Sequence, residues 1–105
     1  MVKRKPHHDL AAVQLKFGDP ATLQVTTTAA RSALELGFGR TQIVAVVQAL
    51  ARADFVKSET AHSPPNSRVW HDTYVTPFDG KQLYLKFAGE TLVDLTLTSF
   101  KERSS

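Results

Sequence analysis

The spacing of apolar residues changes once along this chain, just after Ala53, and this change constrains the fold more than any other feature. Before it, apolar residues recur every three or four positions, as on one face of an amphipathic helix. After it, apolar and polar residues alternate, as in strands that are buried on one face only. Helices followed by hairpin-linked strands predict an α+β domain.

Three helices are expected in the first half, each beginning at a side chain that can cap it and most ending near a glycine. They are Leu10–Phe17 after Asp9, residues 29–36 after Thr28, and Gln42–Ala53 after Thr41. The residues Leu23–Thr26 predict a short strand between the first two helices.

Four strands are expected in the second half, separated by turn residues. Their ranges are Phe55–His62, Arg68–Val75, Gln82–Ala88 and Leu92–Phe100. The segment Ser63-Pro64-Pro65-Asn66 predicts a loop, and Asp79-Gly80 predicts a tight hairpin turn. Three or four antiparallel strands would carry the N-terminal helices on one face, which leaves the other face partly in contact with water.

Size and composition favour a single domain over residues 1–105, with a basic arm at Met1–Pro6 and a polar tail at 102–105. The chain contains no cysteine, which excludes disulfides and thiolate metal sites. Its four histidines have no tight ligand spacing, so no metal or other cofactor is expected. No apolar run is long enough for a membrane span, and a cytoplasmic protein is expected. The net charge of +3 is compatible with binding to nucleic acid.

The strand at Gln82–Ala88 gives the first candidate site residues. Burial of its leucines and phenylalanine would turn Tyr84 and Lys86 toward the opposite, open face. A tyrosine beside a lysine on an open sheet can stack on a base and bind a phosphate. The alternative is an ordinary solvated strand face.

The segment around Trp70 gives a second candidate, His71. Its imidazole can serve as a general acid or base because histidine titrates near neutral pH, although a surface histidine without a role is the alternative. Asp72 follows directly in the strand and should point to the other face, so it is a poor candidate to orient the ring. Trp70 is the only tryptophan, and we expect it in the core.

Two lysines complete the set of candidates. Lys57 and Lys101 lie near the ends of the first and last predicted strands, where each can stabilise charge on a phosphate or remain a solvated lysine. Strict alternation would place Lys101 on the same face as Val93, Leu95 and Leu97. Either Lys101 lies beyond the buried part of its strand, or a β-bulge turns it toward the open face.

Several ordered blocks give the chain a resemblance to a known family. They are Lys3-Arg4-Lys5-Pro6-His7, Thr27-Thr28-Ala29-Ala30-Arg31-Ser32-Ala33, Glu35-Leu36-Gly37, Ala53-Asp54-Phe55-Val56-Lys57-Ser58, Val69-Trp70-His71-Asp72-Thr73-Tyr74, Gln82-Leu83-Tyr84-Leu85-Lys86 and Ser99-Phe100-Lys101-Glu102. Over almost its whole length the chain resembles the motility quorum-sensing regulator (MqsR) toxins, which are bacterial mRNA interferases related in fold to the RelE group.

The resemblance implies a toxin of a type II toxin–antitoxin pair that cuts single-stranded mRNA, preferentially beside GC, without a metal. It implies an antitoxin partner with a helix-turn-helix DNA-binding domain. The family's active-site positions fall on Lys57, His71, Tyr84 and Lys101. Some members carry glutamine where this chain has His71, and glutamine can orient a group but cannot take a proton at neutral pH. The role of His71 as a general base therefore stays open.

We hypothesise that the RNA's own 2′-hydroxyl attacks the adjacent phosphate, with Lys86 and Arg68 guiding the RNA backbone. Two other classes of protein remain possible on the sequence alone. One is a non-catalytic RNA-binding or regulatory module, and the other is an interaction domain whose basic surface meets an acidic antitoxin. Cleavage of RNA by the purified protein separates them.

Overall fold

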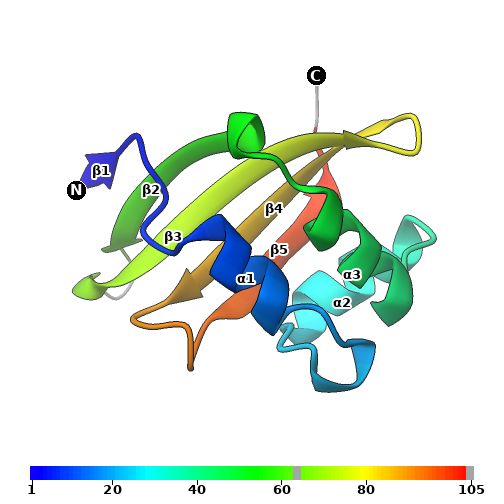
Figure 1. The fold of residues 1–105 in the computed structure, drawn as a ribbon, viewed down its shortest axis with the longest axis horizontal. Helices are drawn as coiled ribbons and strands as arrows, with labels where there is room; N and C mark the ends of the chain where they lie inside the picture. Colours follow the sequence, from blue (N-terminus) through cyan, green and yellow to red (C-terminus); the bar gives the residue numbers. More distant parts are fainter. Residues whose placement is uncertain (63–64, 104–105) are drawn as a thin grey trace.

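A computed structural model describes residues 1–62 and 65–103, and over this part of the chain it confirms the α+β architecture (Figure 1). An antiparallel sheet of five strands carries the helices on one face, with the strands in the order of the sequence. The strands are β1 (Val2–Lys3), β2 (Phe55–His62), β3 (Pro65–Phe78), β4 (Lys81–Gly89) and β5 (Thr96–Glu102). The additional strand, β1, comes from the basic arm, for which no strand was predicted.

The predicted helices are present, with shifted ends. They are α1 (Leu10–Lys16), α2 (Thr27–Glu35) and α3 (Arg40–Ala49), with 3₁₀ turns η1 (Pro20–Thr22) and η2 (Arg52–Asp54). Asp9 caps α1 as predicted, by accepting from the amide of Ala12. Among the described residues, no helix has the length and apolar character needed to span a membrane.

The boundaries that sequence reasoning placed wrongly have local causes. Thr26, not Thr28, caps α2, because its hydroxyl accepts from the amide of Ala29. The helix α3 ends at Ala49 rather than Ala53, since Asp54 accepts from the amide of Ala51 and closes the separate turn η2.

The predicted strand at Leu23–Thr26 is wrong. Only Val25 forms a bridge, to Leu97 of β5, before the next helix begins. The amide of Thr26 donates to the carbonyl of Leu97, and the amide of Leu97 donates to the carbonyl of Gln24. This short pairing covers the start of the outer edge of β5.

Strand β3 is longer than predicted, because it begins at Pro65 and ends at Phe78. Pro65 and Asn66 therefore belong to the strand, while the other two residues of the predicted loop lie outside the described part of the chain. The predicted hairpin turn is confirmed, since Asp79 and Gly80 both have positive φ, of 52° and 76°.

Strand β5 begins four residues later than predicted, at Thr96. Residues 90–94 form a turn instead, in which the carboxylate of Asp94 accepts from the amides of Thr91 and Glu90. The hydrogen bond from Thr91, followed by that from Glu90, lowers the pKa of Asp94 to about 2. The prediction that Val93 shares a buried face is wrong, because its side chain is 84% exposed in this turn.

A β-bulge in β5 settles which way Lys101 points. Lys86 pairs with Ser99 and Phe87 pairs with Leu97, so Thr98 is an extra residue in β5. Because of this insertion, Leu97 and Phe100 are both buried in the core, and Ser99 and Lys101 turn to the opposite face.

The core fills the space between the helices and the inner face of the sheet. Phe17 of α1 packs edge-to-face on Phe87, with 5.2 Å between ring centroids, and Tyr74 of β3 packs on Phe87 at 6.0 Å. The hydroxyl of Tyr74 has no hydrogen-bond partner within the described residues, and burial raises its pKa above the ordinary range. These rings fix the position of the sheet beneath the helices.

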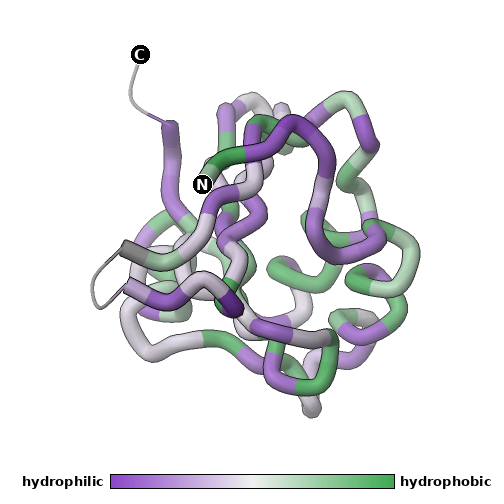
Figure 2. The backbone as a smooth tube through the Cα atoms, turned by 90° about the vertical axis from the view of Figure 1, so that its left-hand side faces the viewer, coloured by the Kyte–Doolittle hydropathy of each residue, from purple (hydrophilic) through white to green (hydrophobic). Residues whose placement is uncertain are grey.

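The N-terminal arm is fixed to the sheet by a buried carboxylate. Asp72 of β3 is 1% exposed and accepts from the amides of His7 (3.1 Å) and His8 (2.9 Å). It also accepts from the hydroxyl of Ser58. The ring of His8 makes a further hydrogen bond with the carbonyl of Gly89, at 3.1 Å. After a hydrophobic start at Met1 and Val2 the arm is hydrophilic (Figure 2), yet it is part of the fold.

The prediction that Trp70 lies in the core is wrong, because this residue is half-buried beneath the arm. Its ring stacks on His7 with 5.1 Å between centroids, and the ammonium of Lys3 lies 4.2 Å from its centroid. Trp70 shares the inner face with Asp72, at the end of β3 that the arm covers.

Replacing Asp72 with alanine should lower the free energy of unfolding by about 2–3 kcal/mol, because it leaves buried donors without an acceptor. Urea denaturation measures this change. Glu90→Ala removes an exposed carboxylate and is the matched control, with a change within about 0.5 kcal/mol expected. Equal stability of the two variants would contradict the structural role of Asp72.

Candidate active site

The open face of the sheet carries the predicted site residues in cross-strand rows. The first row is Glu59, His71 and Ala88; the second is Lys57, Thr73, Lys86 and Ser99; the third is Val75, Tyr84 and Lys101. These side chains point away from the helices, because their strand neighbours are the buried residues of the core. Lys57, His71, Tyr84 and Lys101 therefore share one face, although they come from four different strands.

Tyr84 lies between two cations. Lys101 stands directly opposite it on β5, and its ammonium is 5.0 Å from the centroid of the phenol ring. The ammonium of Lys86 lies 5.9 Å from the same ring. Both distances are within the range of cation–π attraction, which holds the two amines near the phenol. An anion that binds beside Tyr84 would meet two positive charges.

Lys57 forms an ion pair with Glu59, with 3.2 Å between the ammonium and a carboxylate oxygen. Glu59 also stands directly opposite His71 in the register of β2 and β3. Sequence reasoning did not single out this carboxylate. The signal was available, because Lys57 and Glu59 are two positions apart in one predicted strand and must share a face.

Thr73 occupies the centre of the second row, between Lys57 and Lys86. Its side chain is 1% exposed, and its hydroxyl has no hydrogen-bond partner in the part of the chain that the structure describes. A buried hydroxyl without a partner is uncommon in folded proteins and marks a position worth testing. Here Thr73 stands between Lys57 and Lys86 in the strand register, on an otherwise solvent-facing surface.

The structure does not bring Arg68 to this group. It lies three positions along β3 from His71 of the first row, about 10 Å of strand, and seven positions, about 23 Å, from Val75, the residue that faces Tyr84. The register between β2 and β3 also shifts beside Arg68, between Thr60 and Ala61. Within residues 1–62 and 65–103, no group of three or more histidines and carboxylates lies close enough together to coordinate a metal.

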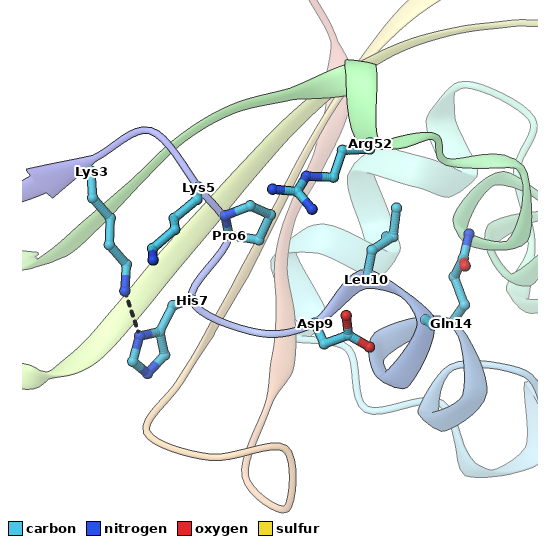
Figure 3. Close-up of a pocket in the computed structure, with 9 residues that line it drawn as sticks. Lys3, Lys5, Pro6, His7, Asp9, Leu10, Gln14 and Arg52 are labelled. Carbon is cyan, nitrogen blue, oxygen red and sulfur yellow. Dashed lines mark hydrogen bonds between the residues drawn. The ribbon is translucent and has the colours of Figure 1, made fainter.

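Two clefts lie away from the centre of the open face. One, of about 170 Å³, adjoins Lys101 and is lined by Thr28, Ser32, Thr98 and Ser99 at the junction of α2 and β5. The other, of about 730 Å³, is lined by Lys3, Lys5, His7, Asp9, Gln14 and Arg52, and we call it the arm cleft (Figure 3). It opens between the N-terminal arm, α1 and η2.

His7 in the wall of the arm cleft has a perturbed pKa. Partial burial, and then the charge of Lys3, lower the pKa of its ring below 6.5. The ammonium of Lys3 lies 3.0 Å from Nδ1 of His7, so the unprotonated ring accepts a hydrogen bond there. Protonation of the ring would set two positive charges side by side.

The fold and this face define a small α+β domain with helices on one side of an antiparallel sheet and amines and a phenol on the other. Such a surface can bind a phosphodiester through its amines and a nucleotide through its aromatic ring. Comparison with known families matches residues 5–102 to the family described as "Motility quorum-sensing regulator, toxin of MqsA". The chain belongs to this family, as the resemblance of its sequence blocks indicated. A comparison with curated proteins found no match.

We expect protonation of His7 to loosen the arm from Trp70. Because the pKa of His7 is lowered on folding, its contribution to stability is complete above pH 6.5. That contribution is lost progressively as the pH falls from 6.5 through the lower pKa of the folded protein. The fluorescence of Trp70, the only tryptophan, should therefore change with a midpoint below pH 6.5. The His7→Ala variant is the control and should not show this change. An unchanged fluorescence titration in that variant, or a midpoint above pH 6.5 in the wild-type protein, would contradict the expectation.

Proposed function

We propose that this protein is the toxin of a type II toxin–antitoxin pair and cuts single-stranded mRNA as a metal-independent endoribonuclease, preferentially at GC-containing sites. The observation that carries the proposal is the presence of Lys57, Tyr84 and Lys101, from three strands, on one open face. The family description, which names a toxin of MqsA, supports the toxin role and an antitoxin partner. We propose that this partner carries a helix-turn-helix DNA-binding domain.

In the proposed reaction the 2′-hydroxyl of the RNA attacks the adjacent phosphorus. A bond forms between the 2′-oxygen and phosphorus, and the bond between phosphorus and the 5′-oxygen of the next nucleotide breaks. The 2′-hydroxyl gives up its proton and the leaving 5′-oxygen gains one. The products are a 2′,3′-cyclic phosphate and a 5′-hydroxyl end. The nucleophile is already tethered beside the phosphorus, so the protein has to supply charge stabilisation and proton transfer.

The open face offers groups for both tasks. Lys57 and Lys101 would stabilise negative charge on the phosphate as the phosphorus becomes pentacoordinate. Tyr84 would either transfer a proton or position the nucleotide, and it stands beside Lys101. Lys86, the other amine near Tyr84, would bind the RNA backbone at a neighbouring phosphate. Arg68 would guide the RNA farther along β3.

His71 has two possible roles in this scheme, as a proton carrier or as a side chain that only lines the site. Glu59 pairs with it across β2 and β3 in the strand register, and its carboxylate would stabilise a protonated imidazole. Replacing His71 with glutamine keeps hydrogen-bonding capacity but removes proton transfer at neutral pH. A fall in kcat of about 10²–10⁴-fold in the His71→Gln variant would show that the imidazole transfers a proton. A kcat equal to that of the wild-type protein would show that His71 only lines the site.

Purified protein should cut a synthetic single-stranded RNA containing GC steps in the presence of EDTA, and leave cyclic phosphate ends. The variants Lys57→Ala, Tyr84→Phe and Lys101→Ala should each lower the rate by about 10²–10⁴-fold if the group transfers a proton or stabilises the transition state. The control is Lys81→Ala, which removes a lysine at the start of β4 that strand alternation turns to the face opposite Tyr84. Gel analysis of the products and their ends measures both results.

Two outcomes would contradict parts of this proposal. Loss of cleavage on adding EDTA would remove the metal-independent mechanism, and full activity in all three variants would remove the assignment of the site. RNA that binds to the wild-type protein but is never cut would favour a non-catalytic RNA-binding module instead. Growth arrest on expression, relieved by the antitoxin, tests the toxin role separately.

A further inference from the structure

We propose that the arm cleft binds the phosphodiester backbone of the RNA substrate, a few nucleotides away from the bond that is cut. The inference rests on the proposed ribonuclease function and adds a second RNA-binding site to it. The cleft lies on the helix side of the sheet edge, so it is separate from the row of Lys57, Thr73 and Lys86 on the open face.

The charge of the arm cleft favours an anion. Three cations line it, Lys3, Lys5 and Arg52, against the single carboxylate of Asp9. That carboxylate already accepts from the amide of Ala12 as the cap of α1. Within the described residues, Lys5 and Arg52 form no ion pair and no hydrogen bond through their side chains, so both remain available to a ligand. Figure 3 shows these two side chains on either side of Pro6, one from the arm and one from η2.

The arm that supplies Lys3 and Lys5 is held in place before any ligand arrives. Asp72 accepts from the amides of His7 and His8, which directly follow the arm, and β1 pairs with β2 at Ser58 and Glu59. A cleft whose walls are already fixed loses less conformational entropy on binding than a free basic tail would. The basic arm is therefore better suited to form a binding site than a solvated tail of the same composition.

The position of the cleft favours RNA as its occupant. Arg52 precedes Lys57 by five residues, so the two Cα atoms are at most about 18 Å apart. An RNA strand that crosses the edge of the sheet near β1 can reach the cleft within a short single-stranded segment. The cleft also places an aromatic ring beside its cations, since His7 lines it together with Lys3, and His7 is supported from behind by stacking on Trp70. That combination is typical of surfaces that bind single-stranded nucleic acid.

The test compares a short and a long RNA, both made uncleavable by a 2′-O-methyl group at the ribose that would attack. The short RNA covers only the bond to be cut, and the long RNA extends several nucleotides on each side. The double variant Lys5→Ala/Arg52→Ala should raise the Kd of the long RNA about tenfold and leave the Kd of the short RNA unchanged. Fluorescence anisotropy measures both constants. The control, Arg31→Ala/Lys81→Ala, removes the same charge elsewhere and should change neither Kd more than twofold.

The salt dependence provides a second measurement. Loss of two phosphate contacts should reduce the slope of log K against log salt concentration by about 1.4 for the long RNA. An unchanged Kd and an unchanged slope in the double variant would overturn the inference, whether or not the wild-type protein cuts RNA. Weaker binding of the antitoxin without any effect on RNA would also overturn it and assign the cleft to a protein partner. Absence of cleavage by the wild-type protein counts against the proposed function alone, since these binding assays do not depend on catalysis.

Discussion

The register in which β3, β4 and β5 pair is the constraint on which both faces of the domain depend. Leu83, Leu85 and Phe87 must enter the core, and this alone sends Tyr84 and Lys86 to the other side. A slip of one residue would exchange the two sets and destroy the core and the candidate site together. The same constraint acts on β5 through the extra residue Thr98, because the core requires both Leu97 and Phe100. Leaving the side chain of Leu97 or Phe100 exposed to water would cost more free energy than the bulge, which disrupts the β-sheet hydrogen bonds at only one position.

Much of this arrangement follows from sequence, because alternation is a local property. The range of β2 and the outward direction of Tyr84 were predictable from the pattern alone. The direction of Lys101 was not, since the bulge depends on how α2 and β5 share the core rather than on the residues beside it. The late start of β5 depends on Asp94, whose two amide contacts make a turn of residues that otherwise alternate like a strand.

Long-range contacts explain the remaining features that the sequence did not predict, which are the fixed arm and the position of Trp70. Asp72 and His8 are 64 residues apart, and nothing in either segment indicates that a carboxylate from β3 fixes the arm. Once that contact exists, Trp70 has a cover made of His7 and Lys3, so the one tryptophan is satisfied outside the core. Asp72 also shows why its neighbour His71 faces the opposite way. The sequence reasoning correctly separated these two side chains, but it could not say what the buried carboxylate binds.

The ion pair between Lys57 and Glu59 shows how a binding face can be ordered and still remain available to substrate. The lysine side chain is 44% exposed and the carboxylate 17% exposed, so water screens much of their attraction. A pair whose lysine is exposed to this extent contributes about 1 kcal/mol, which is less than a charge-assisted contact to a phosphate can offer. Glu59 therefore positions Lys57 in the free protein and would not compete strongly for it with the proposed RNA substrate. The carboxylate also remains opposite His71, where a second positive charge can develop on the imidazole. Its removal would free the lysine and at the same time take away the partner of any protonated imidazole, so Glu59 links the two ends of the candidate site.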